Sequence, residues 1–295
     1  MKAISIILFA AMCLATIAGA QTVTNVVAGQ VGDTAEVSHF KVVTEDKSKQ
    51  TFIVNGVSFT MIAVEGGTFT MGCTSEQGFD CYDSEKPAHS VTLSDYYIGQ
   101  TEVTQALWIA VMGTTISQQR DKADTSWPLR GEGDNYPMYY VSWEDCQTFV
   151  QKLNSLLSSQ LGDMRFALPT EAQWEYAARG CEKSNGCKYS GSNTIDNVAW
   201  HSDNSGSSTH PVATKTPNEL GLYDMSGNVW EWCQDSYVSY NSSSQSYPQG
   251  ASSGSYRVSR GGSWNSNARR CRVSCRDHST PTFSFVNLGF RLVCL

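Results

Sequence analysis

Cysteine thiols are the side chains of this sequence with the widest chemistry, since they form disulfides, ligate soft metals and act as nucleophiles. Past an apolar N-terminal segment the cysteines are Cys73, Cys81, Cys146, Cys181, Cys187, Cys233, Cys271, Cys275 and Cys294. Cys73 with Cys81, and Cys181 with Cys187, each bracket a glycine-containing loop, which is compatible with a local disulfide in both cases. The odd total leaves at least one thiol unpaired, and the remaining connectivity stays open.

Other catalytic patterns are missing from the sequence. The histidines lack the spacing of a zinc site, and they are His39, His89, His201, His210 and His278. No serine lies in a nucleophile elbow, and no glycine-rich stretch resembles a phosphate-binding loop. The formal net charge of −7 argues against nucleic acid as a partner.

The stretch from Asn265 to Asn287 has a biased composition, because it contains no Lys, Glu, Gln, Met or Trp. Every residue in it can be encoded by a codon that ends in a pyrimidine, the outcome expected when the adenines of asparagine codons are randomised. Its residue types suit a binding surface, with Phe283 and Phe285 as anchors among polar and small side chains. The alternative is a chance composition in which both phenylalanines belong to the core and alternate with Ser284 along a strand.

The N-terminus reads as a secretory signal. Lys2 is followed by an apolar run, Ile4–Ile17, and by the small residues at 18–20, so we expect cleavage near Ala20 and a secreted or exported protein. A membrane anchor is disfavoured because the run is shorter than the ~20 residues of a span, and no second stretch is apolar enough to cross a bilayer.

The remaining chain divides into a small N-terminal extension, residues 21–55, and a main domain, residues 56–295. Alternation predicts short strands at Val23–Val27 and Phe40–Val43 in the extension. At the start of the domain it predicts two strands, Phe59–Val64 and Gly67–Gly72, joined at residues 65–67, and then a third at His89–Leu93.

Three segments have the periodicity of helices. They are Thr104–Met112 with Thr104 as N-cap, Trp143–Leu161 with Ser142 and Asp145 as a capping box, and Thr170–Arg179. Beyond Gly180 the pattern indicates loops and short strands around Trp200, Trp230, Trp232 and Trp264.

A series of motifs in fixed order resembles the formylglycine-generating enzyme, or sulfatase-modifying factor, family. They are Gly66–Gly72, Glu102–Thr104, Val141–Trp143, Arg165–Arg179, Gly227–Trp232, Arg260–Trp264 and Gly289–Arg291. The resemblance covers about Phe59 to Leu292. It implies an α+β, C-type-lectin-like fold, rich in loops, with a few short helices and small antiparallel sheets.

The same resemblance implies a copper chemistry that this chain does not carry. Active family members hold copper between two cysteines spaced C-x4-C after the Gly-Gly-Ser-aromatic motif, where the present sequence has Ser266 and Cys271. A hydroxyl is a poor ligand for Cu(I), so we expect no copper and no catalytic residues. A pair displaced to Cys271 and Cys275, on one face of a strand, is the remaining route to copper.

Structural calcium is the second family property, and the resemblance places its ligands on two sets of residues. The first is Asp224, Gly227, Val229 and Glu231, where two carboxylates and two backbone carbonyls would form an oxygen-only cage. The second is Asn197, Val198, Asn204 and Gly206, where Asn204 replaces an acid and lowers the charge of the site. The alternative is that Asp224 and Glu231 cap turns without a metal.

The family frame and the biased stretch together resemble the variable proteins of diversity-generating retroelements. The resemblance implies a variable region at residues 264–292 whose diversified, ligand-binding positions are Ser266, Arg270, Cys275, Asp277, His278, Ser279, Phe283, Ser284, Phe285 and Val286. Arg269, Arg272, Arg276 and Arg291 would be fixed and would pair with carboxylates or carbonyls beneath it.

The sequence therefore predicts a secreted, non-catalytic protein that binds an unknown protein or surface ligand. A copper-dependent oxidase that makes formylglycine from a cysteine of sulfatases is the alternative, and a structural envelope component is a third hypothesis.

Overall fold

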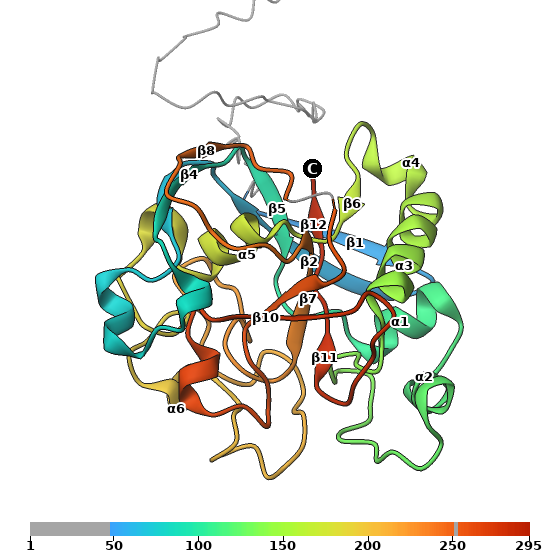
Figure 1. The fold of residues 1–295 in the computed structure, drawn as a ribbon. Helices are drawn as coiled ribbons and strands as arrows, with labels where there is room; N and C mark the ends of the chain where they lie inside the picture. Colours follow the sequence, from blue (N-terminus) through green and yellow to red (C-terminus); the bar gives the residue numbers. More distant parts are fainter. Residues whose placement is uncertain (1–47, 251–252) are drawn as a thin grey trace, which may run out of the picture. The chain divides into compact units, whose positions relative to one another are not determined.

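Three β-sheets frame the domain in the computed structural model, which describes residues 48–250 and 253–295 (Figure 1). The largest has the strand order β1-β2-β5-β12-β6, which are Lys49–Val54, Val57–Val64, Tyr96–Gly99, Val293–Cys294 and Phe166–Ala167. The second has the order β10-β9-β7-β11, which are Arg276–Ser279, Arg257–Arg260, Trp230–Ser236 and Leu288–Gly289. The third has the order β3-β4-β8, which are Thr68–Met71, His89–Thr92 and Gln245–Ser246. These short strands and small sheets confirm the predicted fold class.

The edge strand β1 is built from residues that the sequence assigns to the N-terminal extension. β1 pairs with β2 in antiparallel register, from Lys49 opposite Ile62 to Val54 opposite Val57. Phe52 is buried and lies edge-on against Phe166, with ring centroids 5.0 Å apart. The strand is therefore part of the domain's largest sheet. The predicted signal and the predicted strands at Val23–Val27 and Phe40–Val43 lie outside the described residues.

The two strands predicted at the start of the domain exist, but they do not form a hairpin. β2 pairs with β1 and β5, whereas β3 pairs with β4 in another sheet. The chain crosses between the sheets at Gly66, whose amide donates to Asp95 Oδ1 over 2.8 Å. A Cβ at Gly66 would meet the carbonyl oxygen of Leu93 at 2.4 Å, so only glycine permits this crossing. Alternation predicted the strands, but it does not identify their partners.

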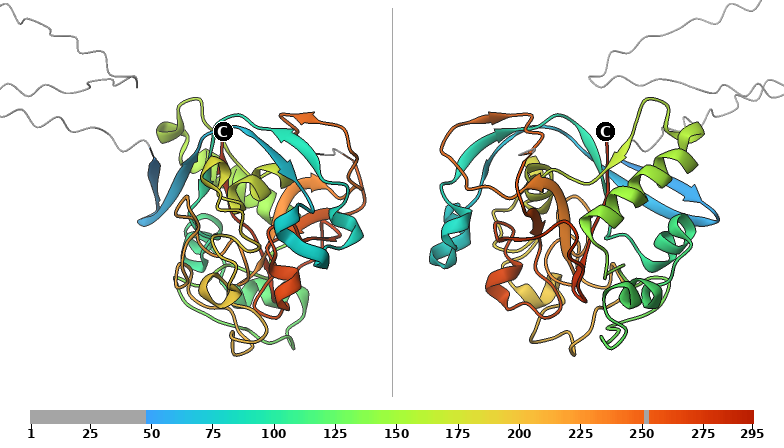
Figure 2. Two further views of the ribbon diagram at one scale, coloured as in Figure 1. Left: turned by 90° about the vertical axis from the view of Figure 1, so that its left-hand side faces the viewer. Right: turned by 45° about the vertical axis from the view of Figure 1, so that its right-hand side comes forward.

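The three predicted helices are α1 at Gln105–Met112, α3 at Trp143–Leu156 and α5 at Glu171–Ala178. Their N-cap residues are Thr104, Ser142 and Thr170, and Asp145 completes the capping box of α3. The predicted helix over 143–161 breaks at Leu157, after which α4 spans Ser158–Leu161. α1 and α3 pack against each other at the end of the large sheet that carries β1 and β2 (Figure 2).

The sequence does not predict several short helices, because their apolar residues do not recur with helical periodicity. They are α2 at Ile116–Ala123, α6 at Ile195–Val198 and the 3-10 helices η1 at Ser75–Asp80, η2 at Asp83–Glu85, η3 at Cys181–Lys183 and η4 at Ala268–Cys271. α2 did leave one signal, because Thr115 and Gln118 form a capping box. In the described part of the chain, no helix combines the length and apolarity that crossing a bilayer requires.

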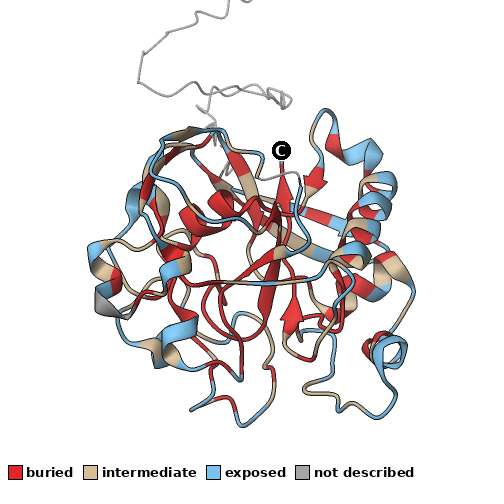
Figure 3. Cartoon of the chain, in the orientation of Figure 1, coloured by how far each residue is buried: buried red, intermediate tan, exposed pale blue. Residues whose placement is uncertain are grey.

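The centre of the domain is buried along α5 and β7, as Figure 3 shows. Every residue of α5 is buried, including the charged Glu171 and Glu175. Trp230 and Trp232 of β7 are buried as predicted, and Trp232 donates to the carbonyl of Val141 over 3.0 Å. A fully buried helix that carries carboxylates needs cationic partners, and these are Arg179 at the end of the helix and Arg260 and Arg276 from the C-terminal region.

Candidate functional site

The predicted variable region wraps the second sheet and returns through the core. It contains η4, the edge strand β10, a loop over residues 280–287 and β11. The loop is fastened to the start of α3, because Tyr140 donates its amide to Phe285 over 3.0 Å and Glu144 donates to Pro281 over 3.3 Å. One side of this region therefore rests on the domain while the other is presented outward.

Buried arginines hold the region from beneath. The guanidinium of Arg272 binds both oxygens of Glu85 at 2.6 and 2.7 Å. Arg276 holds Glu171 at 2.6 and 2.7 Å, and Arg291 holds Glu231 at the same two distances. These bidentate pairs confirm the scaffold role predicted for the arginines, with charge-assisted bonds that fix position as well as charge.

Arg269, the fourth predicted scaffold arginine, lies nearer the surface. Its guanidinium sits 3.7 Å from the centre of the Tyr82 ring and donates to the carbonyl of Cys81 over 3.5 Å. The sequence did not single out Arg260, which is fully buried and pairs with Glu175. Because Glu175 lies on α5, this pair joins the helix to β9 in the same network.

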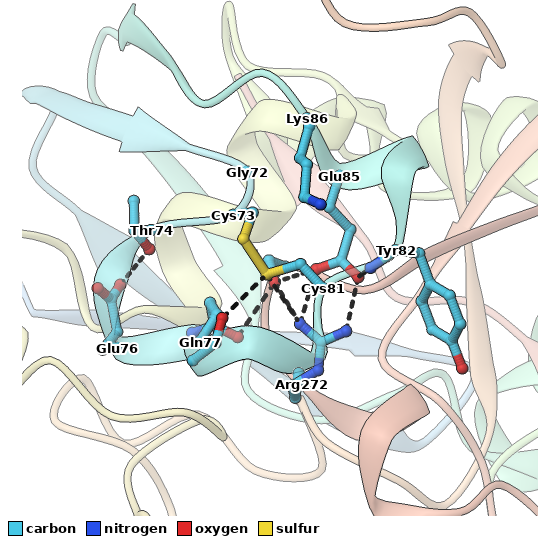
Figure 4. Close-up of a disulfide and its surroundings, with 12 residues drawn as sticks. Gly72, Cys73, Thr74, Glu76, Gln77, Cys81, Tyr82, Glu85, Lys86 and Arg272 are labelled. Atoms are coloured by element: carbon cyan, nitrogen blue, oxygen red, sulfur yellow. Dashed lines mark hydrogen bonds and ion pairs between the residues drawn. A yellow bond between two sulfur atoms is a disulfide. The ribbon is translucent and has the colours of Figure 1, made fainter.

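A disulfide completes the anchoring on one side (Figure 4). Cys73 and Cys81 are bonded, as their spacing suggested, and the loop that they close leads directly into Glu85. Arg272 donates to Cys81 Sγ over 3.7 Å while it binds Glu85. The second suggested disulfide is absent, since Cys181 and Cys187 are free thiols, and Cys181 Sγ donates to the carbonyl of Tyr176 instead.

The carboxylate of Asp235 is held beside the Arg276–Glu171 pair. Its Oδ2 accepts the backbone amide of Glu171 over 2.8 Å. Burial, followed by the charge of Glu171, raises the pKa of Asp235 to about 7. Between pH about 4 and about 7 the folded chain thus keeps a proton that the unfolded chain has released.

We therefore expect Asp235 to lower the free energy of unfolding as the pH rises from about 4 to about 7, with no further change above. Asp235→Asn keeps the accepting oxygen and removes the titration. Urea unfolding at several pH values should show the variant gaining stability relative to the wild type across this range. The exposed Asp163→Asn is the control, and a constant difference between wild type and Asp235→Asn would contradict the expectation.

The structure divides the ten predicted binding residues by exposure. Ser266, Cys275 and Val286 are buried, so they cannot contact a partner directly. The exposed or partly exposed residues are Arg270, Asp277, His278, Ser279, Phe283, Ser284 and Phe285. Arg270 pairs with Asp277 at the surface and lies 5.4 Å from the centre of the Trp230 ring. The presented surface is thus smaller than the sequence suggested.

Aromatic residues from other parts of the chain support the exposed side chains. Phe283 stacks on Phe285 at 5.7 Å between centroids, and Phe285 meets Trp127 edge-on at 5.4 Å. Phe283 is 40 % exposed, which contradicts the alternative that both phenylalanines are core residues. A pocket of about 270 Å³ lies beside them, between Phe283 and Ser284 on one wall and Lys122 and Trp127 on the other.

His278, which lies on β10, is also supported by aromatic side chains. Its ring stacks on Tyr237 at 4.1 Å and meets Tyr256 edge-on at 4.9 Å. Sequence reasoning did not select Trp127, Tyr237 or Tyr256, because no local pattern connects them to residues tens of positions away. Aromatic side chains with one face exposed are well suited to recognition, since they offer contact area at a low cost in entropy.

The two positions of the family's copper pair lie near the backbone amide of Ser263. This amide donates to Ser266 Oγ over 3.1 Å, and its proximity lowers the pKa of Cys271 in part. Burial nevertheless raises the pKa of Cys271 to about 12, so its reactive thiolate is disfavoured. Cys271 and Cys275 do not share a strand, because Cys271 ends η4 and β10 begins only at Arg276, but the two thiols are close enough for Cys275 to help raise the pKa of Cys271. Burial likewise raises the pKa of Cys275 to about 12.

The sequence matches the family described as "Sulfatase-modifying factor enzyme 1-like domain" over residues 53–294. The chain belongs to this family. The match begins at Ile53 in β1 and ends at Cys294, the last residue of β12. The family's domain therefore includes the end of β1 and all of β12.

Relatives of this sulfatase-modifying-factor domain have several names. A protein of Paenibacillus barcinonensis named "Chaperone protein LppX" is 34% identical over 251 residues, covering 74% of this chain and 83% of its own length. The formylglycine-generating enzyme of Streptomyces coelicolor is 31% identical over 288 residues, covering 78% and 87%. Among solved structures, Treponema denticola variable protein 1 superposes with a TM-score of 0.70 at 36% identity, over 83% of this chain and 98% of its own.

The first predicted calcium set fits the ion in part. Asp224 is buried and its Oδ1 has no hydrogen-bond partner, while Oδ2 accepts the amide of Ala213. Glu231 is already bound by Arg291 and by the indole of Trp174 at 2.6 Å. No three His, Cys, Asp or Glu side chains within the described ranges converge on a metal position, so an ion at Asp224 would need the carbonyls of Gly227 and Val229.

The second predicted calcium set does not fit. Asn204 accepts the amide of His201 through Oδ1 at 2.8 Å and donates from Nδ2 to Ala199 and Asp196. Its side chain thus closes the loop that an ion would otherwise organise, and the acid-to-amide replacement removes the charge.

Calcium at Asp224 remains a proposal with a direct test. If the ion occupies the first set, millimolar Ca²⁺ should raise the thermal midpoint above its value in chelator, by mass action. Asp224→Asn should abolish that increase, whereas the exposed Asp134→Asn should keep it. Equal midpoints of the wild type in Ca²⁺ and in chelator would show that Asp224 caps its turn without metal.

Proposed function

We propose that this protein is a secreted, non-catalytic ligand-binding protein, which presents a diversified C-terminal surface on its sulfatase-modifying-factor domain. The observation that carries the proposal is the state of the family's reactive position. Ser266 is buried and hydrogen-bonded to Ser263, and the remaining Cys271 is a buried thiol with a raised pKa. A domain built this way has lost one of two copper ligands while its fold is intact.

The similarity to Treponema denticola variable protein 1 supports a variable surface on this fold. The structure adds a physical separation between support and surface. The buried pairs of Arg272, Arg276 and Arg291 hold the region, and none of these arginines is exposed. Arg270, His278 and Phe283 are exposed and take no part in these ion pairs, so we expect that they can change without breaking them.

A protein or cell-surface ligand is the partner class that this surface fits. It offers an exposed ring at Phe283, an imidazole on a tyrosine pair at His278 and an ion pair at Arg270 and Asp277. Aromatic and arginine side chains are the residues that dominate protein recognition energetically. With a formal charge of −7 the chain is unsuited to nucleic acid.

Sequencing the neighbourhood of the gene tests the proposal. We expect a reverse transcriptase gene and a near-copy of the codons for residues 264–292 that differs only at adenines. The absence of both, together with identical variable regions in sister genes, would overturn the diversified-surface proposal and favour a structural component.

The alternative is a copper-dependent oxidase, and the formylglycine-generating enzymes among the relatives favour it. Its test is independent of the gene's neighbourhood. Stoichiometric copper on the purified protein, with oxidation of a peptidyl cysteine that is lost in Cys271→Ser, would support the enzyme. Oxidation without dependence on Cys271 would point to a contaminant and leave the binding proposal standing.

A further inference from the structure

A second cavity lies away from the exposed residues of the variable region. It has a volume of about 290 Å³ and opens where the end of β7 and the start of α5 meet the loop over residues 238–250. Its lining includes His89, Asp235, Tyr240 and Arg276, together with Gln245 and Gln249 from the loop. Neither the family's reactive position nor the predicted calcium sets contribute to it.

The Arg276–Glu171 ion pair in this cavity is already satisfied. Arg276 binds both oxygens of Glu171 and also donates to the carbonyl of Val238 over 2.8 Å. Tyr240 donates its hydroxyl to Glu171 over 3.0 Å, and its ring covers Arg276 at 4.1 Å. A phosphate or carboxylate ligand would have to compete with a buried bidentate pair, and a cation would have to compete for the same carboxylate. The cavity is thus electrostatically unsuited to an ion.

The uncommitted polar groups are of a different kind. Asp235 accepts the amide of Glu171 at Oδ2, and no side chain within the described ranges forms an ion pair with its carboxyl. His89 is buried and contacts the carbonyl of Pro87 through Nδ1 at 3.2 Å, which leaves Nε2 as an acceptor. Both residues line the cavity, and the amides of Gln245 and Gln249 offer donors and acceptors at its rim.

The walls also provide flat apolar surface. The ring of Tyr240 packs edge-on against His89 at 4.8 Å, and Pro248 and Met71 complete the lining. Pockets for drug-sized ligands begin at about 300 Å³, so this cavity suits a ligand of about one ring. Burial raises the pKa of Asp235 to about 7, so its carboxyl can donate as well as accept near neutral pH.

We infer that this cavity binds a neutral, hydroxyl-rich ligand of the size of one sugar ring. Hydroxyl groups both donate and accept, which matches a set made of a carboxyl, an imidazole acceptor and two amides. The ring would lie against Tyr240 with its hydroxyls directed to Asp235 and His89. This inference goes beyond the proposed binding surface and does not depend on a diversified region.

Saturation-transfer NMR on the whole mature protein tests the inference with three probes: the methyl glycosides of glucose, galactose and N-acetylglucosamine. We expect saturable binding of at least one of these glycosides, with a dissociation constant of about 1 mM. An oligosaccharide that ends in the same sugar should compete with the free glycoside. Competition by the oligosaccharide would identify a chain end as the ligand, and its failure would identify the free sugar.

Two tryptophan substitutions in one loop provide the matched comparison. Ser239 is exposed and lines the cavity, so Ser239→Trp should fill it and weaken binding by at least about tenfold. Ser244 is exposed on the same loop outside the lining, so Ser244→Trp should bind as the wild type does. Both variants should keep the wild-type thermal midpoint within about 2 °C. Absence of saturable binding of all three probes, or binding that is unchanged in Ser239→Trp, would overturn the inference.

Discussion

Replacing Glu85 by alanine is expected to lower the free energy of unfolding by about 3–5 kcal/mol, because it leaves the buried guanidinium of Arg272 without its carboxylate. Both side chains of this pair are fully buried, and their two bonds are 2.6 and 2.7 Å long. Urea unfolding followed by tryptophan fluorescence would measure the change. Since the pair fastens the variable region to the disulfide loop, the variant should also expose that region to protease.

Two further variants distinguish the loss of the Glu85–Arg272 ion pair from a general destabilisation of this segment. Asp83→Ala alters the same 3-10 helix, but Asp83 is exposed and its only ion pair among the described residues is with Lys86, so it should cost no more than about 1 kcal/mol. Glu85→Leu combined with Arg272→Met removes both charges and should recover much of the loss. Equal losses from Glu85→Ala and Asp83→Ala would show that the buried pair does not hold the region.

Replacing Ser266 by cysteine is expected to give a chain that binds Cu(I) stoichiometrically and more tightly than the wild type does. Ser266 Oγ accepts the amide of Ser263, and the same amide lowers the pKa of Cys271, so both positions lie near one backbone group. A second thiolate supplies the soft ligand that Cu(I) requires. Competition with a chromogenic Cu(I) chelator would measure the affinity of wild type and variant.

The controls for this substitution are also available in the chain. Ser266→Ala should bind no more copper than the wild type, and Ser266→Cys with Cys271→Ser should return to that level. If the wild type already holds one equivalent of copper that depends on Cys271 and Cys275, the displaced pair exists and the non-catalytic proposal fails. If Ser266→Cys binds no more copper than the wild type, the variable region no longer preserves the geometry of the family's copper pair.

Local sequence patterns predicted the local structure of this chain well. The capping residues Thr104, Ser142 and Thr170 start their helices where the pattern placed them. Such caps are satisfied within three residues, so the information needed to read them is local. The helix break at Leu157 left no signal in the apolar pattern, and the absence of a β2–β3 hairpin arises from pairing with other strands, β5 for β2 and β4 for β3.

The candidate site shows the same division at the level of single residues. Ser266, Cys275 and Val286 belong to the biased stretch by composition, yet the fold buries them. Trp127, Tyr237 and Tyr256 carry no sequence signal for this site, yet they support Phe285 and His278. Composition indicates which positions we propose to be variable, whereas exposure depends on which segments pack above them.

The sequence by itself determined the family, the helix starts, the loss of one copper cysteine at Ser266 and the arginines that serve as scaffold. Each of these depends on residue identity and short spacing, which the chain carries directly. Only the tertiary structure decided which carboxylates those arginines meet, such as Glu85 for Arg272 across 187 positions. It also decided which variable residues reach solvent, and it assembled the cavity at Asp235. The physical reason is that burial and long-range pairing depend on all the packed segments together, and no single stretch of sequence contains that information.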